Sequence, residues 1–404
     1  MSTLVVVGAS LAGAKAAEAA RAHGFDGRIV LVGDEAGAPY ERPPLSKGIL
    51  RGDAGTETAL VHPAGYYGSE QIELVTDRAV RLDLVRRRVE LAGGDAIDFD
   101  TAVLATGAEP RRLDVAGAEL AGVHHLRTIE DAVRLRDAIR SATRVAVIGA
   151  GWIGSEVAAS ARTMGADVVL IDPGRVPLRR VVGDEIGAMF RQLHVDNGVD
   201  VRLGTRVTAL RGTKTVEAVV LDDGRIEAAD VVVVGVGVEP RTEVAEATAG
   251  LRVGNGILVD ARLETNVPGI FAAGDVANAW HPHYGRQLRV EHWANALNQG
   301  TTAGRNAAGG RELYSRLPYF FSDQYDVGME YVGYGAEGDS VVVRGDLHGR
   351  ELIAFWHRSG IVTAAMNVNV WGVIDDMKAI VESGAPVDVT RLADPEVPLR
   401  DIVR

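Results

Sequence analysis

Hydrophobic and polar positions near the N-terminus follow a strand, turn, helix and strand order. Leu4–Val7 is apolar and mostly β-branched, which predicts a strand buried on both faces. Ala14–His23 is rich in alanine and predicts a helix, and Arg28–Val32 predicts a second strand that leads to Asp34 and Glu35. This order is typical of a βαβ unit in a parallel sheet.

The same pattern occurs a second time between Arg144 and Asp172. A strand at Val145–Ile148 precedes a turn, a helix is expected over Ser155–Met164, and a strand at Asp167–Ile171 leads to Asp172. Two βαβ units in a chain of 404 residues predict an α/β protein with two doubly wound domains.

The remaining segments complete this organisation. Thr101–Gly107 predicts a buried strand that ends in a turn, Val231–Val234 predicts the last strand of the second module, and Thr265–Asp275 returns to the first. From Tyr319 the sequence becomes aromatic and rich in strands, which predicts a C-terminal α+β domain. The expected boundaries are one dinucleotide-binding domain over 1–110 and 243–318, a second over 111–242, and the C-terminal domain over 319–404.

Each βαβ unit contains a glycine-rich turn between its first strand and its helix. The first glycine turn, 8–13, fits G-x-G-x-x-G except that Ser10 replaces the second glycine, whereas the second glycine turn, 149–154, is complete. Such turns let a pyrophosphate approach the backbone and the N-terminus of the helix. The candidate binding residues of the two turns are Gly8, Ser10, Ala12, Gly13, Gly149, Gly151, Ile153 and Gly154.

An acidic residue after the second strand of such a unit binds the adenosine ribose. Asp34 and Glu35 are the candidates in the first unit, and Asp172 is the candidate in the second. Asp172 would repel a 2′-phosphate, although Arg175 and its basic neighbours could attract one, so the sequence favours NADH over NADPH.

Composition excludes several classes of function. The chain has no cysteine, which rules out disulfides, Cys-ligated zinc or iron–sulfur centres, cysteine nucleophiles and a redox-active dithiol. A net charge of −12 argues against nucleic acid or an anionic membrane as a partner. The longest apolar run, 231–238, is too short to span a bilayer, and no targeting segment precedes the first strand, so we expect a cytoplasmic protein. His281 and His283 flank Pro282 and predict a loop without a metal.

Two dinucleotides on one chain indicate that one reduces the other. A nicotinamide delivers a hydride, and a flavin stores two electrons that it can release singly. Gly274-Asp275, at a predicted strand-to-helix turn, is placed for Asp275 to bond a flavin ribityl chain while the following helix N-terminus faces the ring. An N-cap role for Asp275 is compatible with this prediction.

Several motifs in combination resemble the oxygenase-coupled NADH:ferredoxin reductases, which have glutathione-reductase-like folds. The resemblance covers nearly the whole chain and rests on Pro39-Tyr40-x-Arg42-Pro43-Pro44-Leu45-Ser46-Lys47, Ala105-Thr106-Gly107, His124-His125-Leu126-Arg127-Thr128, Ala272-Ala273-Gly274-Asp275-Val276, Glu291-His292-Trp293-Ala294-Asn295-Ala296 and Ser322-Asp323-Gln324. It implies FAD at the first site and NADH at the second.

The resemblance also implies roles for individual residues. FAD contacts are expected at Ala12, Asp34, Lys47, Val80, Arg127, Asp275 and Trp293, and NAD contacts at Glu156, Asp172 and Glu291. Further cofactor-binding candidates are Arg42, Ala105, Thr106, Gly107, Gly237, Gly274, His292 and Phe321, the last where similar reductases often carry tryptophan.

The same resemblance pairs Lys47 with Glu156 beside the flavin as catalytic residues. A cation near the ring would stabilise the charge of reduced flavin, and a carboxylate would keep that cation charged and oriented. A solvated surface lysine is the alternative for Lys47.

The sequence therefore predicts an FAD-dependent NAD(P)H:ferredoxin oxidoreductase. Electrons would pass from NADH through FAD, singly, to a transiently bound [2Fe-2S] ferredoxin that feeds a cytochrome P450 or a ring-hydroxylating oxygenase. A rubredoxin reductase, or an NADH-switched flavoprotein resembling apoptosis-inducing factor, is the alternative. We expect a monomer or a homodimer.

Overall fold

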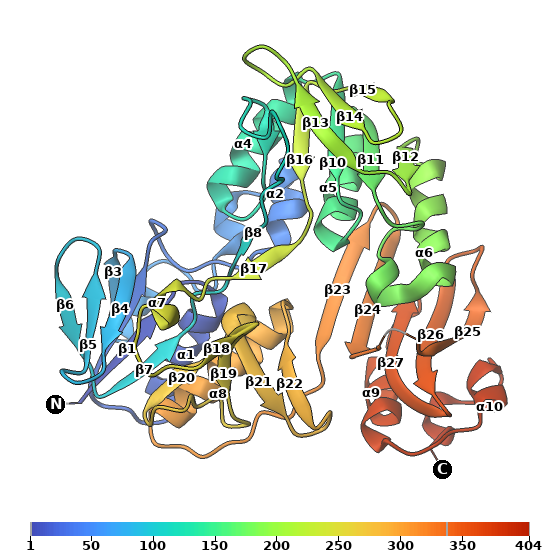
Figure 1. Cartoon of the computed structure of the whole chain (residues 1–404). Coiled ribbons are helices and arrows are strands. Elements are labelled where there is room, and N and C mark those ends of the chain that lie inside the picture. The colour runs from blue at the N-terminus through green and yellow to red at the C-terminus, as the bar shows by residue number, and fades with distance from the viewer. Residues whose placement is uncertain (1, 337, 404) are drawn as a thin grey trace. The chain divides into compact units, whose positions relative to one another are not determined.

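Strands and helices of the chain group into two compact units. The computed structural model describes residues 2–336 and 338–403 (Figure 1). The first unit comprises residues 1–41, 59–109 and 239–318, and the second comprises 42–58, 110–238 and 319–404. Segment 42–58 thus groups with the second unit, and the three-domain division stays a prediction.

A five-stranded parallel sheet forms the centre of the first unit. Its order is β20-β7-β1-β2-β3, and Val5 of β1 lies opposite Val30 of β2 and Ala102 of β7. Leu4, Val5 and Val6 are fully buried, as expected for a strand covered on both faces. The strands are β1 (Thr3–Val7), β2 (Arg28–Gly33), β3 (Ile72–Thr76), β7 (Thr101–Leu104) and β20 (Ile270–Ala272).

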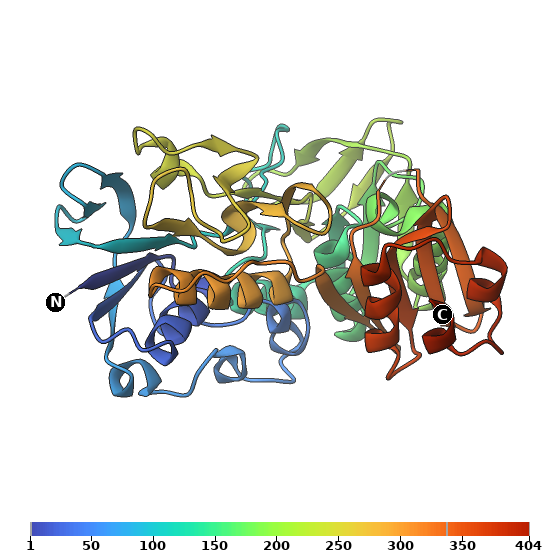
Figure 2. The same cartoon turned by 90° about the horizontal axis from the view of Figure 1, so that it is seen from below.

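Two helices of the first unit cross at very short range. In Figure 2 the blue helix α1 (Leu11–Ala22) and the orange helix α8 (Trp293–Ala307) lie side by side. A Cβ atom on Gly300 would overlap the carbonyl oxygen of Ala12, and one on Gly304 would overlap that of Ala16. Only glycine fits these two positions of α8. Helix α1 begins three residues before the predicted start because the end of the first glycine turn is already helical.

Smaller elements complete the first unit. The antiparallel sheet β4-β5-β6 and the sheet β18-β19-β21-β22 lie in this unit. Their bounds are β4 (Ala79–Asp83), β5 (Arg88–Leu91), β6 (Ala96–Asp98), β18 (Val253–Gly254), β19 (Gly256–Val259), β21 (Ala277–His281) and β22 (Arg286–Arg289). The short helices are α3 (Tyr66–Ser69), α7 (Glu243–Glu246) and the 3-10 turn η3 (Gly274–Val276).

The second unit contains the repeat of the parallel sheet. Its order is β12-β11-β10-β16-β9, with β10 pairing in parallel with both β11 and β16. The strands are β9 (Val123–His124), β10 (Arg144–Ile148), β11 (Asp167–Asp172), β12 (Asp200–Leu203) and β16 (Val231–Val234). Beside it are the antiparallel strands β13 (Val207–Arg211), β14 (Ala218–Leu221) and β15 (Ile226–Ala228), and helices α4 (Ile129–Ser141), α5 (Trp152–Thr163) and α6 (Arg179–Asp196).

An antiparallel sheet of order β23-β24-β27-β26-β25 forms the C-terminal part of the second unit. Its strands are β23 (Tyr319–Gln324), β24 (Val327–Gly333), β25 (Ser340–Asp346), β26 (Glu351–Arg358) and β27 (Ile361–Val368). Helices α9 (Ile374–Ser383) and α10 (Val389–Ala393) and the turn η4 (Leu399–Asp401) follow, so the predicted last helix begins after Trp371.

Aromatic packing joins the C-terminal sheet to the second parallel-sheet module. Trp152 of α5 contacts Phe190 of α6 at a ring-centroid distance of 5.8 Å and Phe320 of β23 at 4.9 Å. Phe190 and Phe320 belong to one buried apolar cluster. Trp152 therefore packs on a helix of its own module, as its place in the glycine turn predicts, and also on the C-terminal sheet, which the sequence does not predict.

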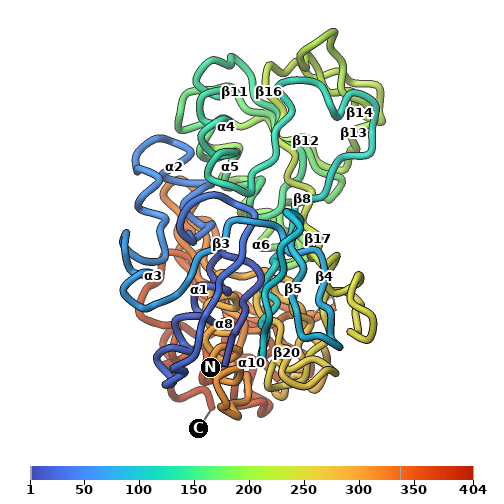
Figure 3. Tube along the Cα trace, turned by 90° about the vertical axis from the view of Figure 1, so that its left-hand side faces the viewer, coloured from blue at the N-terminus to red at the C-terminus, as the bar shows by residue number. Residues whose placement is uncertain are grey.

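Segment 42–58 of the second unit contains two short helical turns and the start of a third. The 3-10 helix η1 (Pro43–Ser46) precedes helix α2 (Gly48–Arg51), where the sequence predicted one helix start near Ser46. Helix α2 lies beside α4 and α5 (Figure 3). Another 3-10 turn, η2 (Thr56–Ala59), follows, and β8 (Ala108–Pro110) with β17 (Val238–Pro240) forms a two-stranded sheet. Within the described part of the chain, every helix is too short or too polar to cross a membrane.

Candidate active site

The backbone of the first glycine turn is packed closely against neighbouring backbone atoms, which leaves no room for a side chain at two of its positions. Gly8 has φ +115°, and a Cβ atom there would overlap the carbonyl oxygen of Ala105. A Cβ atom on Gly13 would overlap the carbonyl oxygen of Gly8. Ser10 is the N-cap residue of α1, and its side chain makes no capping hydrogen bond. The first turn of α1 is therefore left uncapped by Ser10, as expected where a phosphate takes that place.

The second glycine turn has the same construction. Gly149 has φ +103°, and a Cβ atom there would overlap the carbonyl oxygen of Gly235. A Cβ atom on Gly154 would overlap Gly149, whereas one on Gly151 would meet no atom within 4 Å. The middle position of the turn therefore faces open space, which explains why Ser10 is tolerated at the equivalent position of the first turn.

The acidic residues after β2 both have partners within the first unit. Asp34 accepts a hydrogen bond from Arg241 at 2.7 Å, and Glu35 accepts one from the Tyr40 hydroxyl. Burial raises the pKa of Asp34, but the hydrogen bond and charge of Arg241 outweigh it and hold that pKa below its usual value. Asp34 is thus held ionised, as a ribose acceptor must be.

Arg241 is a residue that the sequence reasoning missed. It is itself held by its neighbours, because Thr106 donates to the Arg241 carbonyl oxygen at 2.6 Å and the Arg241 amide donates to Gly107 at 3.0 Å. Arg241 is 207 residues from Asp34, so no local pattern could have indicated this contact.

Asp172 joins the second glycine turn to the loop after β11. The Ala150 amide donates to Asp172 Oδ2 at 2.7 Å, and the Gly174 amide donates to Oδ1 at 2.6 Å. A carboxylate has about four acceptor sites, so ribose hydroxyls can still donate to both oxygens. Asp172 is therefore held in place before a nucleotide binds.

We expect Asp172→Ala to weaken NADH binding by about 1–3 kcal/mol, the scale of a lost hydrogen bond to a charged group. The ratio of kcat/KM for NADH to kcat/KM for NADPH should fall, because the carboxylate that repels the 2′-phosphate is removed. Steady-state kinetics with both nucleotides measures the effect, and Asp167→Ala, an exposed carboxylate at the start of the same strand, is the matched control. A higher kcat/KM for NADPH than for NADH in the unchanged protein would contradict the assignment.

Half-buried Lys47 and buried Glu156 form an ion pair within the second unit. The Lys47 Nζ atom lies 2.7 Å from Glu156 Oε2, and the two side chains are 15% and 4% exposed. Ser46 donates to the same carboxylate oxygen at 2.5 Å, and Ser322 donates to Oε1 at 2.7 Å. We call Ser46, Lys47, Glu156 and Ser322 the Glu156 cluster.

Three segments far apart in the sequence build the Glu156 cluster. Glu156 lies in the second turn of α5, Lys47 follows η1, and Ser322 lies on β23. Ser160, one turn further along α5, donates to the Ser46 carbonyl oxygen at 2.7 Å and fixes η1 against the helix. The Phe321 ring centroid lies 5.8 Å from Lys47 Nζ, within range of a cation–π contact. Lys47 is therefore half-buried and paired, unlike a solvated surface lysine.

Two more cofactor candidates of the second unit lie close together. Arg42 donates to the Arg127 carbonyl oxygen. The next residue, Thr128, is the N-cap of α4 and forms a capping box with Asp131. The 124–128 motif therefore fixes the start of a helix while it holds Arg127 beside Arg42.

The surroundings of Asp275 correct one prediction. Asp275 lies in the 3-10 turn η3, and the next element is strand β21, where the sequence predicted a helix. The neighbouring helix is α8, which starts 18 residues later at Trp293, and its Gln299 accepts a hydrogen bond from the Gly274 amide at 3.0 Å. Tertiary packing, and not chain order, therefore brings a helix to the Gly274-Asp275 turn.

Four further residues predicted to bind a cofactor differ in burial and in their hydrogen-bond or ion-pair partners. His292 is the N-cap residue of α8, and burial lowers its pKa to about 4, so the imidazole is neutral at pH 7. Glu291 pairs with Arg289 at 2.7 Å. Val80 is half-buried on β4, and the carbonyl oxygen of Gly237 accepts from the Arg111 amide at 3.0 Å. The structure places these residues but leaves their cofactor roles as predictions.

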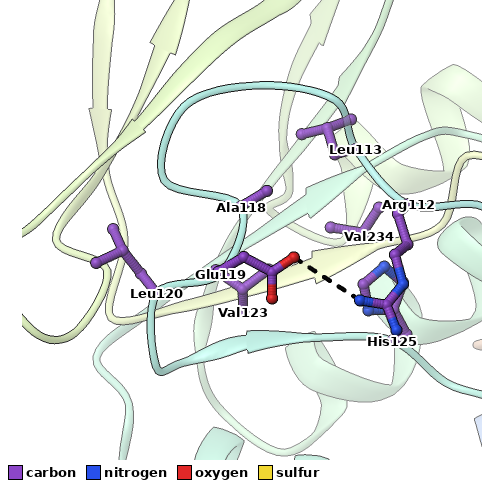
Figure 4. Close-up of a pocket in the computed structure, with 8 residues that line it drawn as sticks. All are labelled: Arg112, Leu113, Ala118, Glu119, Leu120, Val123, His125 and Val234. Carbon is purple, nitrogen blue, oxygen red and sulfur yellow. Dashed lines mark ion pairs between the residues drawn. The ribbon is translucent and has the colours of Figure 1, made fainter.

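A pocket of about 150 Å³ lies on the second parallel-sheet module (Figure 4). Its lining residues are Arg112, Leu113, Ala118, Glu119, Leu120, Val123, His125 and Val234. Arg112 and Glu119 form an exposed ion pair at 3.7 Å, and burial together with the charge of Arg112 lowers the pKa of His125. None of its lining residues belongs to the glycine turns or to the Glu156 cluster.

Among the residues that the structure describes, no three or more histidine, aspartate or glutamate side chains are grouped so that they could hold a metal ion. His281 ends strand β21 and its Nε2 atom is 2.9 Å from the Arg316 carbonyl oxygen, and its ring centroid lies 6.5 Å from that of His283.

Two glycine turns, each followed by an acid, define the chain as an α/β oxidoreductase with two dinucleotide sites. The family model described as pyridine nucleotide-disulphide oxidoreductase matches residues 2–300, and the model described as reductase C-terminal matches residues 319–403. The chain belongs to this family, in the branch of the oxygenase-coupled NADH:ferredoxin reductases.

Similar proteins support that placement. The chain is 40% identical, over 98% of its own length and 98% of the relative, to the anthranilate 1,2-dioxygenase system ferredoxin–NAD(+) reductase component of Burkholderia cepacia. It matches the crystal structure of the ferredoxin reductase for the CYP199A2 system from Rhodopseudomonas palustris with a TM-score of 0.95 and 37% identity, covering 99% of both chains. It also matches the covalent putidaredoxin reductase–putidaredoxin complex with a TM-score of 0.95 and 36% identity, covering 100% of this chain and 98% of the other.

The cofactors of this enzyme are FAD and NADH. The site residues fit them, because both glycine turns leave a helix N-terminus uncapped by a side chain and both are followed by an ionisable acid. The predicted fold class and cofactors are confirmed.

Proposed function

We propose that this enzyme transfers electrons from NADH, through FAD, to a separate [2Fe-2S] ferredoxin. The observation that carries the proposal is the absence of cysteine from a member of a disulphide oxidoreductase family. Without a dithiol, electrons cannot leave through a disulfide of this chain and must go to an outside acceptor. When bound, FAD accepts a hydride from NADH and releases electrons one at a time.

The Glu156 cluster supplies electrostatics for this reaction. We propose that Lys47 provides a fixed positive charge beside the flavin and that Glu156 orients the lysine through their ion pair. Asp172 would orient NADH through its ribose, and Asp34, held ionised by Arg241, would accept the FAD ribose. Burial of Lys47 and Glu156 strengthens their interaction relative to an exposed pair.

The acceptor is proposed from the chemistry of similar proteins. The relative from Burkholderia cepacia serves a dioxygenase system, and the solved structures belong to the CYP199A2 system and to a putidaredoxin complex. We therefore expect the ferredoxin to feed a cytochrome P450 or a ring-hydroxylating oxygenase, in transient contact with the reductase. The proposed place of action is the cytoplasm, where NADH is formed, and a monomer or homodimer remains the expected assembly.

The purified protein should be yellow with one FAD per chain and should bleach when NADH is added without oxygen. Addition of an oxidised [2Fe-2S] ferredoxin should restore the flavin absorbance, and a thiol-specific reagent should leave the rate unchanged because the chain has no cysteine. Stopped-flow absorbance measures both half-reactions, with a rubredoxin as the control acceptor.

The candidate functions predict different results in this experiment. Faster transfer to rubredoxin than to ferredoxin would indicate a rubredoxin reductase. A flavin that NADH bleaches but that no iron–sulfur protein reoxidises would favour a nucleotide-switched flavoprotein. Loss of activity on thiol modification would contradict the direct route.

A further inference from the structure

Glu156 is a buried carboxylate whose two oxygens have different hydrogen-bond donors. Oε2 interacts with Lys47 at 2.7 Å and with Ser46 at 2.5 Å. Oε1 accepts from Ser322 at 2.7 Å, and no other donor to Oε1 is found in residues 2–336 and 338–403. An ionised carboxylate can only accept hydrogen bonds, so the Ser322 hydroxyl must be the donor.

The position of Ser322 is set by the C-terminal sheet. Phe320, Ser322 and Gln324 alternate along β23 and are all buried on one face of the strand. Ser322 lies opposite Met329 of β24, so its register is fixed by antiparallel pairing. Gln324 Nε2 donates to the Ser322 Oγ atom at 3.4 Å, which leaves the hydroxyl proton directed at Glu156. The C-terminal sheet therefore positions the Ser322 hydroxyl to donate a hydrogen bond to Glu156, the carboxylate that pairs with Lys47.

Removing that donor would change the chemistry of Glu156. A hydrogen bond to the ionised form of a carboxyl group lowers its proton affinity, and a buried oxygen without a donor favours protonation. A protonated Glu156 would no longer balance the charge of Lys47, and the lysine would lose the partner that orients it. The effect should increase as pH falls, because protonation is favoured at low pH.

We propose that Ser322 is a positioning residue for flavin reduction, which fixes the Glu156 carboxylate by its hydrogen bond and thereby holds Lys47 in its working orientation. This inference rests on the proposed function, in which Lys47 acts beside the flavin. It assigns the C-terminal domain a direct part in NADH oxidation, in addition to any contact with a ferredoxin.

The other titratable groups near Glu156 do not explain such a pH response. Lys47, from the segment after η1, faces it directly. On the β23 side, Asp323 follows Ser322 and is exposed on the other face of the strand. His194 of α6 interacts with Gln324, and burial lowers the pKa of His194 to about 4. His194 is therefore neutral through the pH range in which an enzyme of this kind would be assayed.

Three variants of the holoenzyme test the proposal. Ser322→Ala removes the donor to Oε1, and Ser322→Thr restores a hydroxyl at the same place. Ser155→Ala is the matched control, because Ser155 precedes Glu156 on α5 and its buried hydroxyl has no hydrogen-bond partner. FAD content and the thermal unfolding midpoint establish that each variant is folded.

The first readout is the pH dependence of the rate at which NADH bleaches the flavin. We expect the acid limb of the profile to move upward by about one pH unit in Ser322→Ala, the size of effect expected for one hydrogen bond to a carboxylate. Ser322→Thr and Ser155→Ala should follow the unchanged protein. A Ser322→Ala profile that superposes on that of the unchanged protein would overturn the proposal.

The second readout does not depend on turnover. The Glu156 carboxyl carbon, labelled with ¹³C and assigned by its loss in Glu156→Gln, should titrate at higher pH in Ser322→Ala than in the unchanged holoenzyme. If Ser322→Ala does not fold, Ser322→Cys replaces it, and a smaller upward movement is expected because a thiol fills the same place but is a weaker donor. No movement in the available variant would overturn the proposal. Failure of NADH to bleach the unchanged protein would instead overturn the proposed function.

Discussion

Lys47→Ala is expected to slow reduction of FAD by NADH by about 10²-fold, the loss typical when one group that stabilises developing charge is removed. Lys47 lies 2.7 Å from a carboxylate that is 4% exposed, so its charge is held in a fixed direction and is poorly screened by water. Loss of that charge should also lower the midpoint potential of the flavin, because reduced flavin carries negative charge.

Glu156→Gln should give a milder defect than Lys47→Ala. Glutamine keeps a side-chain carbonyl that can accept a hydrogen bond from Lys47 but removes the negative charge that pairs with the lysine. The lysine then remains present but less well oriented, so the rate of bleaching should fall between those of Lys47→Ala and the unchanged protein.

Anaerobic stopped-flow bleaching and a dye-equilibrated redox titration measure these two effects. Lys378→Ala is the matched control, since Lys378 is 40% exposed and pairs with Asp375 on the surface of α9 at 3.5 Å. Bleaching rates equal to that of the unchanged protein in both site variants would mean that the buried pair serves stability alone.

Gly300→Ala is expected to destabilise the first unit by about 1–3 kcal/mol, the usual cost of forcing an extra methyl group into a packed interface. A Cβ atom on Gly300 would overlap the backbone of Ala12, so α1 and α8 must separate. Ala12 belongs to the first glycine turn, and its displacement should also weaken FAD binding. The variant should therefore lose FAD on gel filtration as well as unfold at lower temperature.

A second glycine-to-alanine change separates packing from the intrinsic effect of the substitution. Gly68 is exposed in α3, and a Cβ atom there would meet no other atom within 4 Å. Gly68→Ala should change the free energy of unfolding by less than about 0.5 kcal/mol, as surface substitutions commonly do. Calorimetry and bound-flavin absorbance compare the two variants. Equal stability and FAD content in Gly300→Ala and Gly68→Ala would show that the helices can separate without cost.

The sequence alone determined the two parallel sheets and their glycine turns. Leu4–Val7 and Val145–Ile148 were recognised as buried strands because apolar β-branched runs are a local pattern, and both form the predicted strands. The turns that follow them were predicted with equal success, because glycine is required there by short-range backbone geometry. These features depend on neighbours within a few residues, which is the range over which a sequence pattern carries information.

Tertiary structure alone decided which side chains meet at the sites. Resemblance, and not periodicity, suggested the Lys47–Glu156 pair, and nothing in the sequence indicated that Ser322 would complete it from 166 residues away. The Asp34–Arg241 contact and the approach of α8 to the Gly274-Asp275 turn were likewise missed. Hydrogen bonds reach about 3 Å in space regardless of separation along the chain, so their partners are fixed only when strands and helices have packed.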